Sequence, residues 1–390
     1  MFLIFILFFL LVAYGYWEYR SHQFHISQLP VRIHINGTRG KSSVTRLIAG
    51  GLRGAGYSVF AKTTGTKARM IFVDGSEATV LRVGKPNIIE QTRIVATAAG
   101  QKPGFFVTEC MAVQPHLQSL LEKKLIKSQI GVITNVRADH LDAMGPDLEN
   151  VAVALSGTIP RKGHLFTTEE TYLDLLKQRA AEEGAVVHEV SGDDISDSEM
   201  RGFSYIEHKD NVATALAVCQ HLGADRTQAL RGMHETNPDP GVVRRYRIRT
   251  HDKIIEFVSA FAANDPDSTL RIWELLRIHH EPDKTLIVLV NSRKDRIQRA
   301  EQIGEYIASH FDADFYVVTG EYTKPLVAKA IACGMPHNKI EDLGGRSLEA
   351  IFNSVVSLSG EKALVFGMGN IVGFGEEIIG FFKKRGEEIV

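Results

Sequence analysis

A segment rich in glycine, lysine and serine is the part of this sequence best suited to chemistry. Residues 34–46 read HINGTRGKSSVTR, in which Gly37, Gly40 and Lys41 precede two serines. Glycines leave backbone amides at a helix start open to anions, and a neighbouring lysine reaches terminal phosphates. A hydroxyl directly after that lysine is a ligand for Mg²⁺ in phosphate-binding loops. The segment therefore predicts a site for ATP and Mg²⁺, with Ser42 as one metal ligand.

A strand must precede this loop and a helix must follow it. Residues 31–35 alternate polar and apolar side chains as a strand does, and residues 42–56 place apolar residues on one helical face that glycines close. Further short apolar runs alternate with helical stretches, which predicts an α/β fold with a parallel sheet covered by helices. These runs are residues 58–62, 104–109 and 130–135, and later 253–261, 285–292, 315–320 and 362–369.

Ligands for a hard cation follow two of these strands. Glu109 ends one apolar run, and Asn135 ends another, after which come Asp139, His140 and Asp142. Carboxylate oxygens and imidazole at neighbouring strand ends are suitable metal ligands. Taken singly, each is an ordinary surface carboxylate or loop histidine. Together with the loop they predict a metal site.

The chain is long enough for two globular domains and an appendage, since one domain takes about 150 residues. Residues 237–241 read NPDPG, a cluster typical of a linker. We expect an anchor at residues 1–20, a P-loop ATPase domain at 21–240 and a smaller Rossmann-like α/β domain at 241–390.

The first 17 residues carry no charge, and Tyr14, Tyr16, Trp17 and Tyr19 crowd the far end of this apolar run, as at a membrane interface. The sequence predicts a retained membrane anchor; a cleaved signal peptide is the alternative, but it would have a basic start and a small-residue cleavage site. Arg20, Arg32 and Arg39 follow the apolar run, so the positive-inside rule places the catalytic domains in the cytoplasm, at the cell membrane.

Overall composition excludes one class of partner. The 45 basic and 46 acidic residues give no basic field for a nucleic-acid backbone, so we expect no nucleic acid. The three cysteines lie far apart without metal-ligand spacing, which indicates a reducing compartment.

Four segments together resemble the Mur-ligase superfamily, which comprises ATP-dependent amide ligases and includes the folylpolyglutamate synthases. They are NGTRGKSS at 36–43, TNVRADHLD at 134–142, HKDNVATALAV at 208–218 and FAANDPDS at 261–268. The resemblance implies the central and C-terminal domains of that superfamily, with ATP and Mg²⁺ as cofactors. It also implies the nucleotide-binding residues Gly37, Thr38, Arg39, Gly40, Lys41, Ser42, Ser43, Asn211, which would face adenine, Asn264, and either Arg244 or Arg245.

The layout most resembles the membrane-associated ligase subunits of poly-γ-glutamate synthases. A hydrophobic N-terminus leads almost directly into the phosphate loop, and ECMAVQP at 109–115 and GMGNIVGFGEE at 367–377 are similar to segments of those subunits. The resemblance implies glutamate and poly-γ-glutamate as substrates and small membrane subunits of a synthesis and export complex as partners.

The resemblance also implies catalytic roles. Lys41, Glu109 and His140 would be catalytic, with Ser42, Glu109 and His140 as metal ligands. A carboxylate would be activated as an acyl phosphate and then attacked by an amine. Basic residues after strands are candidates for substrate carboxylates, although solvated basic loops are an equal alternative. These are Lys62, Lys67 and Arg69 in one group and Arg293 and Lys294 in another.

Three departures from the family pattern leave alternatives open. Residues 148–157 contain no lysine that could bridge two metals, and Ser259 and Ala263 replace an aspartate and a histidine of the C-terminal motif. A folylpolyglutamate-synthase-like ligase, a P-loop ATPase that drives an exporter without forming bonds, and a scaffold with a degenerate site are the alternatives.

Overall fold

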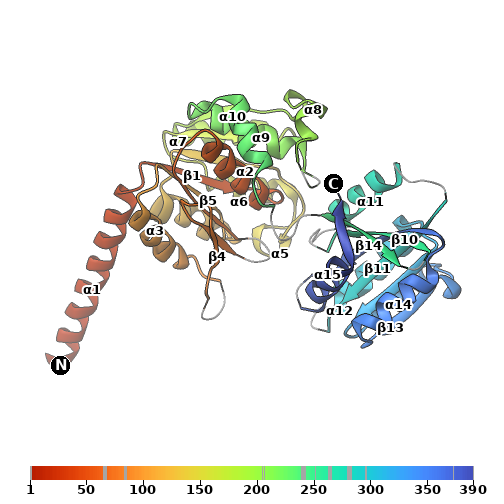
Figure 1. The fold of residues 1–390 in the computed structure, drawn as a ribbon. Helices are drawn as coiled ribbons and strands as arrows, with labels where there is room; N and C mark the ends of the chain where they lie inside the picture. Colours follow the sequence, from red (N-terminus) through yellow and green to blue (C-terminus); the bar gives the residue numbers. More distant parts are fainter. Residues whose placement is uncertain are drawn as a thin grey trace. The chain divides into compact units, whose positions relative to one another are not determined.

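The computed structural model describes residues 2–64, 68–82, 86–203, 205, 207–238, 243–250, 252–261, 266–278, 283–294, 297–371 and 373–389. The chain forms two compact units (Figure 1). The first unit comprises Met1–Phe203 and Glu207–Asp239, and the second comprises Ser204–Ile206 and Pro240–Val390. Each unit is built on its own sheet.

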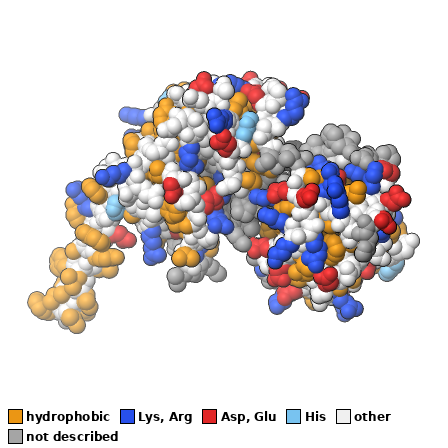
Figure 2. Space-filling model, viewed as in Figure 1, with side chains coloured by type: hydrophobic (Ala, Val, Ile, Leu, Met, Phe, Trp, Pro, Cys, Tyr) orange, Lys and Arg blue, Asp and Glu red, His pale blue; other side chains and the backbone are white. Residues whose placement is uncertain are grey.

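Helix α1 (Phe2–Ser27) is exposed and apolar along most of its length (Figure 2). Its 26 residues span about 39 Å at 1.5 Å per residue, more than the roughly 30 Å of a bilayer core. Among the described residues it is the helix with the length and composition to cross a membrane. The helix continues past residue 20, where the predicted anchor ended, and its last turns bury His22 and Ile26 against the first unit.

The sheet of the first unit has eight strands in the order β4-β3-β2-β5-β1-β6-β7-β8. The six strands from β2 to β8 in this order run parallel, and the hairpin of β3 and β4 adds an antiparallel edge. The strands are β1 (Val31–Asn36), β2 (Val59–Thr63), β3 (Arg69–Ile71), β4 (Glu77–Thr79), β5 (Phe105–Glu109), β6 (Ile130–Ile133), β7 (His164–Thr167) and β8 (Val186–Glu189).

Helices cover both faces of this sheet. The connection through α2 carries the chain from β1 to β2, whereas the connection from β5 to β6 runs the opposite way across the sheet. Because such parallel crossovers are right-handed, the two connections belong to opposite faces. Ligands bind where neighbouring connections leave on opposite faces, so the carboxyl ends of β1 and β5 form the expected binding edge. The helices are α2 (Lys41–Gly54), α3 (Glu90–Gln101), α4 (Pro115–Leu120), η1 (Leu121–Ile126), α5 (Leu141–Met144), α6 (Leu148–Ser156), α7 (Leu173–Glu183), η2 (Gly192–Asp194), α8 (Asp197–Met200), α9 (Lys209–His221) and α10 (Arg226–His234).

The apolar face of α2 fixes the helix in place. Val44, Leu47, Ile48 and Leu52 are fully buried, and α2 packs on α9 and α10. Burying such a side chain contributes about 1.5–3 kcal/mol, so this face holds the start of α2 firmly at the end of β1.

The second unit has a seven-stranded sheet in the order β13-β12-β11-β14-β10-β9-β15. Five strands are parallel, while β9 and the C-terminal β15 form an antiparallel edge. Separate apolar cores fill its two faces, one under α11–α13 and the other under α14 and α15. The predicted α/β fold class is thus confirmed in both units. The elements are β9 (Arg244–Thr250), β10 (Lys253–Ser259), α11 (Pro266–Ile278), β11 (Lys284–Ser292), α12 (Ile297–His310), β12 (Phe315–Gly320), α13 (Lys324–Ala332), η3 (His337–Lys339), β13 (Ile340–Gly344), α14 (Leu348–Leu358), β14 (Lys362–Gly369), α15 (Phe374–Arg385) and β15 (Gly386–Ile389).

Candidate active site

The predicted phosphate loop connects β1 to α2. Gly37 and Gly40 adopt φ of 130° and 82°, a region that favours glycine. Gly40 is the N-cap of α2, so the first amides of the helix have no side-chain cap from this residue. Lys41 Nζ donates to the carbonyl oxygens of Gly37 at 2.6 Å and Thr38 at 3.2 Å. The first amides of α2 and the Lys41 ammonium group therefore gather at one helix end, as an anion site requires.

The end of β6 holds this loop in shape. Asn135 Oδ1 accepts hydrogen bonds from Thr38 Oγ1 at 2.7 Å and from the Arg39 amide at 3.0 Å, and Asn135 Nδ2 donates to the Arg39 carbonyl at 3.1 Å. The hydroxyl of Thr134 donates to the same carbonyl. A methyl group at Gly37 would collide with the Thr134 hydroxyl, so the loop is pressed against β6.

The side chains of two predicted metal ligands, Ser42 and Glu109, meet where β1 and β5 end. Ser42 Oγ donates to Glu109 Oε2 at 2.8 Å, and the Thr64 amide donates to the same oxygen at 2.6 Å. Glu109 is buried. Octahedral Mg²⁺ has ligands at 2.0–2.1 Å, which places neighbouring ligand oxygens about 2.9 Å apart. Ser42 and Glu109 therefore already have the separation of two adjacent Mg²⁺ ligands.

Asn211 lies directly beside the loop, in the first turn of α9. Its Oδ1 atom would be 2.5 Å from a methyl group at Gly40, and its Nδ2 atom donates to Glu207 Oε1 at 2.8 Å. Burial raises the pKa of Glu207, although hydrogen bonds from Asn211 and the His208 amide act in the opposite direction. The carboxyl group of Glu207 thus fixes the amide of Asn211 against Gly40.

Lys62 is fully buried on β2 and lies in the field of two carboxylates. Its Nζ atom is 3.3 Å from Glu90 Oε1, and Glu90 also pairs with Arg82 at 2.6 Å. Burial lowers the pKa of Lys62, an effect that the charges of Glu90 and Glu109 oppose. Arg69 lies opposite Thr63 in the adjoining strand β3. The Lys62 ammonium therefore adds positive charge close to Glu109.

His140 is more loosely connected to the loop. Its side chain is 57 % exposed, and its Nε2 atom lies 3.9 Å from Asp139, whose carboxylate is 3.6 Å from Arg39. The residue adopts φ of 46°, a left-handed conformation at the start of α5 that non-glycine residues seldom occupy. The structure thus places Ser42 and Glu109 in direct contact, while His140 reaches the loop through Asp139 and Arg39.

The remaining candidates belong to the second unit or lie outside the described residues. Arg244 and Arg245 are the two alternatives for a nucleotide contact, and both lie on β9. Arg244 pairs with Glu388 at 3.1 Å and Arg245 pairs with Glu256 at 3.1 Å, so both guanidinium groups already have a carboxylate partner. Arg293 and Lys294 follow β11, and Lys294 lies 3.4 Å from Glu321. Lys67, Asn264 and Ala263 lie outside the described residues.

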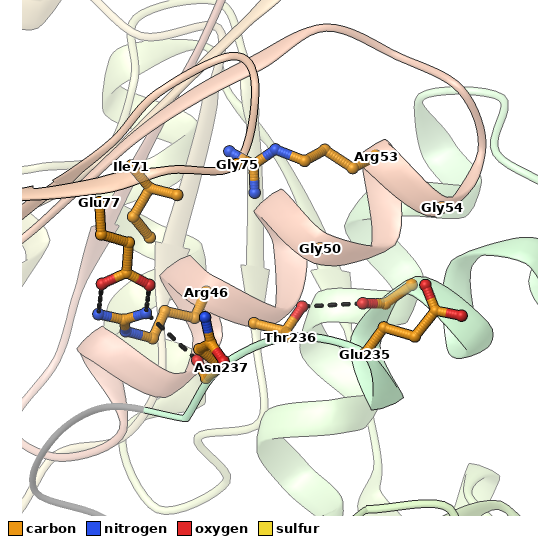
Figure 3. A pocket seen from close by; sticks show the side chains of 11 residues that line it. Arg46, Gly50, Arg53, Gly54, Ile71, Gly75, Glu77, Glu235, Thr236 and Asn237 are labelled. Carbon is orange, nitrogen blue, oxygen red and sulfur yellow. Dashed lines mark hydrogen bonds and ion pairs between the residues drawn. The ribbon is translucent and has the colours of Figure 1, made fainter.

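A small cavity of about 240 Å³ lies farther along α2 (Figure 3). The Arg46 guanidinium binds both carboxylate oxygens of Glu77, at 2.6 and 3.0 Å, and donates to the Asn237 carbonyl at 3.2 Å. Arg53, on the opposite side, donates to two backbone carbonyls. Since both arginine side chains already have acceptors, their role at this cavity is to anchor α2 to its neighbours.

Two contributors were not assigned these roles from the sequence. The sequence marks Asn135 as a strand end but not as the residue that shapes the loop, and it gives no sign of Glu207. The signal for Asn135 was its position after an apolar run. Nothing local marks Glu207, because its burial depends on how α9 packs against α2.

Comparison with known proteins identifies the family. The description "Mur ligase middle domain" matches residues 35–235, and "Poly-gamma-glutamate synthase CapB C-terminal domain" matches residues 245–385. The chain belongs to the Mur ligase family. Mur ligases of this type are ATP-dependent amide ligases. The match includes the loop, Glu109, His140 and Asn211.

Two curated relatives extend this match over most of the chain. The capsule biosynthesis protein CapB of Bacillus anthracis is 41% identical over 371 residues, which cover 95% of this chain and 80% of that protein. The PGA synthase CapB of Bacillus subtilis (strain 168) is 38% identical over 371 residues, covering 95% of this chain and 94% of that protein. The predicted resemblance to the Mur-ligase superfamily is thereby confirmed, and this Mur ligase is of the CapB type.

Solved structures share the fold of this Mur ligase. The bifunctional folylpolyglutamate synthase/dihydrofolate synthase of Yersinia pestis, complexed with AMPPNP and a Mn ion, aligns with a TM-score of 0.66 at 14% identity, covering 93% of this chain and 92% of that one. MurF from Acinetobacter baumannii aligns with a TM-score of 0.65 at 12% identity, covering 96% and 80%. At these identities the likeness concerns the fold.

Proposed function

We propose that this Mur ligase adds glutamate to poly-γ-glutamate, with ATP as the energy source and an acyl phosphate as the intermediate. One observation carries the choice of polymer: the 38% identity to a PGA synthase extends over 95% of the chain. A match to a CapB C-terminal domain over residues 245–385 supports the same choice, because it covers the second unit separately from the shared ATP-binding region.

The phosphate loop is the proposed site of ATP. Lys41 would exchange its carbonyl acceptors at Gly37 and Thr38 for phosphate oxygens, and the first amides of α2 would donate to the same phosphates. Ser42 and Glu109, with His140 from the same edge, would hold Mg²⁺. When bound, the cation neutralises charge on the transferred phosphoryl group.

In the proposed reaction a carboxylate oxygen attacks the γ-phosphorus, the bond from that phosphorus to the bridging oxygen breaks, and ADP leaves. The amine of the second glutamyl reactant then attacks the acyl carbon; the C–N bond forms, phosphate departs with the carboxylate oxygen, and the amine proton passes to solvent. No protein nucleophile takes part. Lys41 and the loop amides act by position and charge, which is how phosphoryl transfer is generally catalysed.

Basic side chains are the proposed contacts for substrate carboxylates. Lys62 and Arg69 come from the edge where Glu109 lies, with Lys67 between them in sequence, and Arg293 and Lys294 follow β11 in the second unit. Lys62 acts on Glu109 through its charge, but it is fully buried and paired with Glu90 at 3.3 Å, so it would have to exchange this partner for a substrate carboxylate.

We place the protein at the cell membrane through α1, with the catalytic domains in the cytoplasm and with small membrane subunits of a synthesis and export complex as partners. The proposed domains are an anchor at residues 1–20, an ATP-binding domain at 21–240 and a C-terminal domain at 241–390. The exposed apolar length of α1 supports the anchor.

The test is ADP and phosphate release by the full chain in detergent, with Mg²⁺ and ATP, with and without glutamate and poly-γ-glutamate. Release that depends on these substrates, with ¹⁴C-glutamate entering polymer, is the expected result. Release indifferent to glutamate, without label in polymer, would instead indicate an ATPase that drives an exporter. In a parallel reaction that contains a folate in place of poly-γ-glutamate, incorporation of label into the folate would indicate a folylpolyglutamate synthase.

A further inference from the structure

Three histidines from distant parts of the sequence meet at one edge of the first unit. His164 opens β7, His188 lies on β8 and His221 ends α9. One ring nitrogen of each lies within 4.8 Å of those of the other two. We propose that this histidine cluster binds a divalent transition cation of the imidazole-preferring class, with Zn²⁺ as its first choice.

The sheet register brings two of these side chains together. His188 pairs with Phe166, which lies two residues after His164. The side chains of His164, Phe166 and His188 therefore project to the same face of the sheet. The His188 ring stacks on Phe166 with centroids 4.3 Å apart and planes 8° apart, which fixes its orientation. His164 Nδ1 and His188 Nε2 are 2.9 Å apart. Two ligand nitrogens of a tetrahedral Zn²⁺ site at 2.0–2.1 Å from the metal are about 3.3 Å apart, so a small movement converts this hydrogen bond into a shared cation.

The third ligand comes from the helix above this face. The His221 ring lies 4.3 Å from the ring of His164 and 5.2 Å from that of His188. Burial lowers the pKa values of His188 and His221, and the neighbouring His164 acts in the same direction. The His221 side chain is exposed, so solvent reaches the cluster.

The ligand atoms of the histidine cluster favour a different metal from those at the phosphate loop. Three imidazoles suit Zn²⁺, Ni²⁺ or Cu²⁺, whereas the oxygen ligands Ser42 and Glu109 suit Mg²⁺. The cation would join β7 and β8 to the last residue of α9, whose first turn carries Asn211 beside Gly40. The cluster would therefore fix the helix that faces the nucleotide loop, without touching substrate. This inference does not depend on which polymer the enzyme makes.

The test uses the full chain in detergent, without a histidine tag and stripped with a chelator. It is titrated with Co²⁺ and then Zn²⁺ in millimolar Mg²⁺, which keeps oxygen ligands occupied. We expect one equivalent of Co²⁺ with the intense visible absorption of a tetrahedral site, and its displacement by Zn²⁺.

Variants then assign the ligands. His221→Gln alters an exposed side chain and should lower the affinity at least ~100-fold, the upper end of what loss of a supporting residue outside the ligand set costs. His188→Gln should do the same, and the exposed His337→Gln in the second unit is the matched control that should bind as the parent does. Absence of stoichiometric tetrahedral Co²⁺, or unchanged affinity in His221→Gln, would overturn the proposal.

Discussion

Replacing Gly40 by alanine should damage the nucleotide loop more than its backbone conformation alone would predict. Gly40 has φ of 82°, and Gly56, just beyond the other end of α2, has φ of 85°. A methyl group at Gly40 would lie 2.5 Å from Asn211 Oδ1, whereas one at Gly56 would meet nothing within 4 Å. The two substitutions therefore share a backbone cost and differ in one contact.

The magnitudes follow from these two terms. A left-handed alanine costs about 1–2 kcal/mol, which applies to both variants. Gly40→Ala must also displace the Asn211 amide, which is buried and donates to Glu207 at 2.8 Å. Loss of a hydrogen bond at a buried group costs about 1–3 kcal/mol. We expect destabilisation of about 1–2 kcal/mol for Gly56→Ala and about 2–5 kcal/mol for Gly40→Ala.

Hydrogen exchange of the α2 amides in the full chain measures this difference locally. Each 1.4 kcal/mol is tenfold, so exchange in Gly40→Ala should be roughly 5- to 150-fold faster than in Gly56→Ala. Since Asn211 is the proposed adenine contact, Gly40→Ala should also raise the ATP concentration for half-maximal ADP release, while Gly56→Ala should not. Equal effects of the two substitutions on exchange and on ATP would refute this reasoning.

Three other predictions concern the metal, the core and the anchor. Glu109→Gln should raise the Mg²⁺ concentration for half-maximal ADP release at least ~10-fold, and an unchanged Mg²⁺ titration would remove Glu109 from the ligand set. Burial alone would lower the pKa of His34, but hydrogen bonds to Cys110 and Glu122 raise it to about 9. The raised pKa of His34 corresponds to roughly 3 kcal/mol of folding stability, which is fully present below pH 6.5 and lost as the pH rises through 9. Calorimetry should therefore show the melting temperature of the first unit falling across this range. A melting temperature that does not change with pH would contradict the charged pair. Leu7→Asp should cost about 2.5–3.5 kcal/mol of membrane insertion and move protein from the membrane pellet to the supernatant. Leu81→Asp, at a side chain that is 90% exposed and lies outside α1, should not. Equal pelleting of the two variants would mean that other contacts hold the protein at the membrane.

The sequence predicted the loop and its flanking elements because their signals are local. Periodicity located β1, α2 and the strands that end at Glu109 and near Asn135, and parallel strands necessarily bring their carboxyl ends to one edge. The antiparallel edges were not predicted. β15 is only four residues long and pairs with β9, which lies about 140 residues earlier in the sequence, and no local pattern specifies this pairing.

Contacts between distant elements account for the rest. The contact of Glu207 with Asn211 depends on the placement of α9, and the partner of Lys62 is a carboxylate on α3. The histidine cluster has no metal-ligand spacing along the chain, since 24 and 33 residues separate its members, and it forms because β7 and β8 are neighbours and α9 returns over them.

The most direct test of the central claim follows oxygen from substrate to phosphate. Glutamate and a short γ-glutamyl oligomer, both with ¹⁸O in their carboxylates, are incubated with the full chain, Mg²⁺ and ATP, with Lys41→Ala as the control. An acyl phosphate predicts one ¹⁸O atom in each phosphate released during bond formation, and near-complete loss of turnover in the Lys41 variant, since removal of one such preorganised charge costs about 10²–10³ in rate. Phosphate released without ¹⁸O, or a Lys41→Ala variant with parental turnover, would contradict carboxylate activation at this loop.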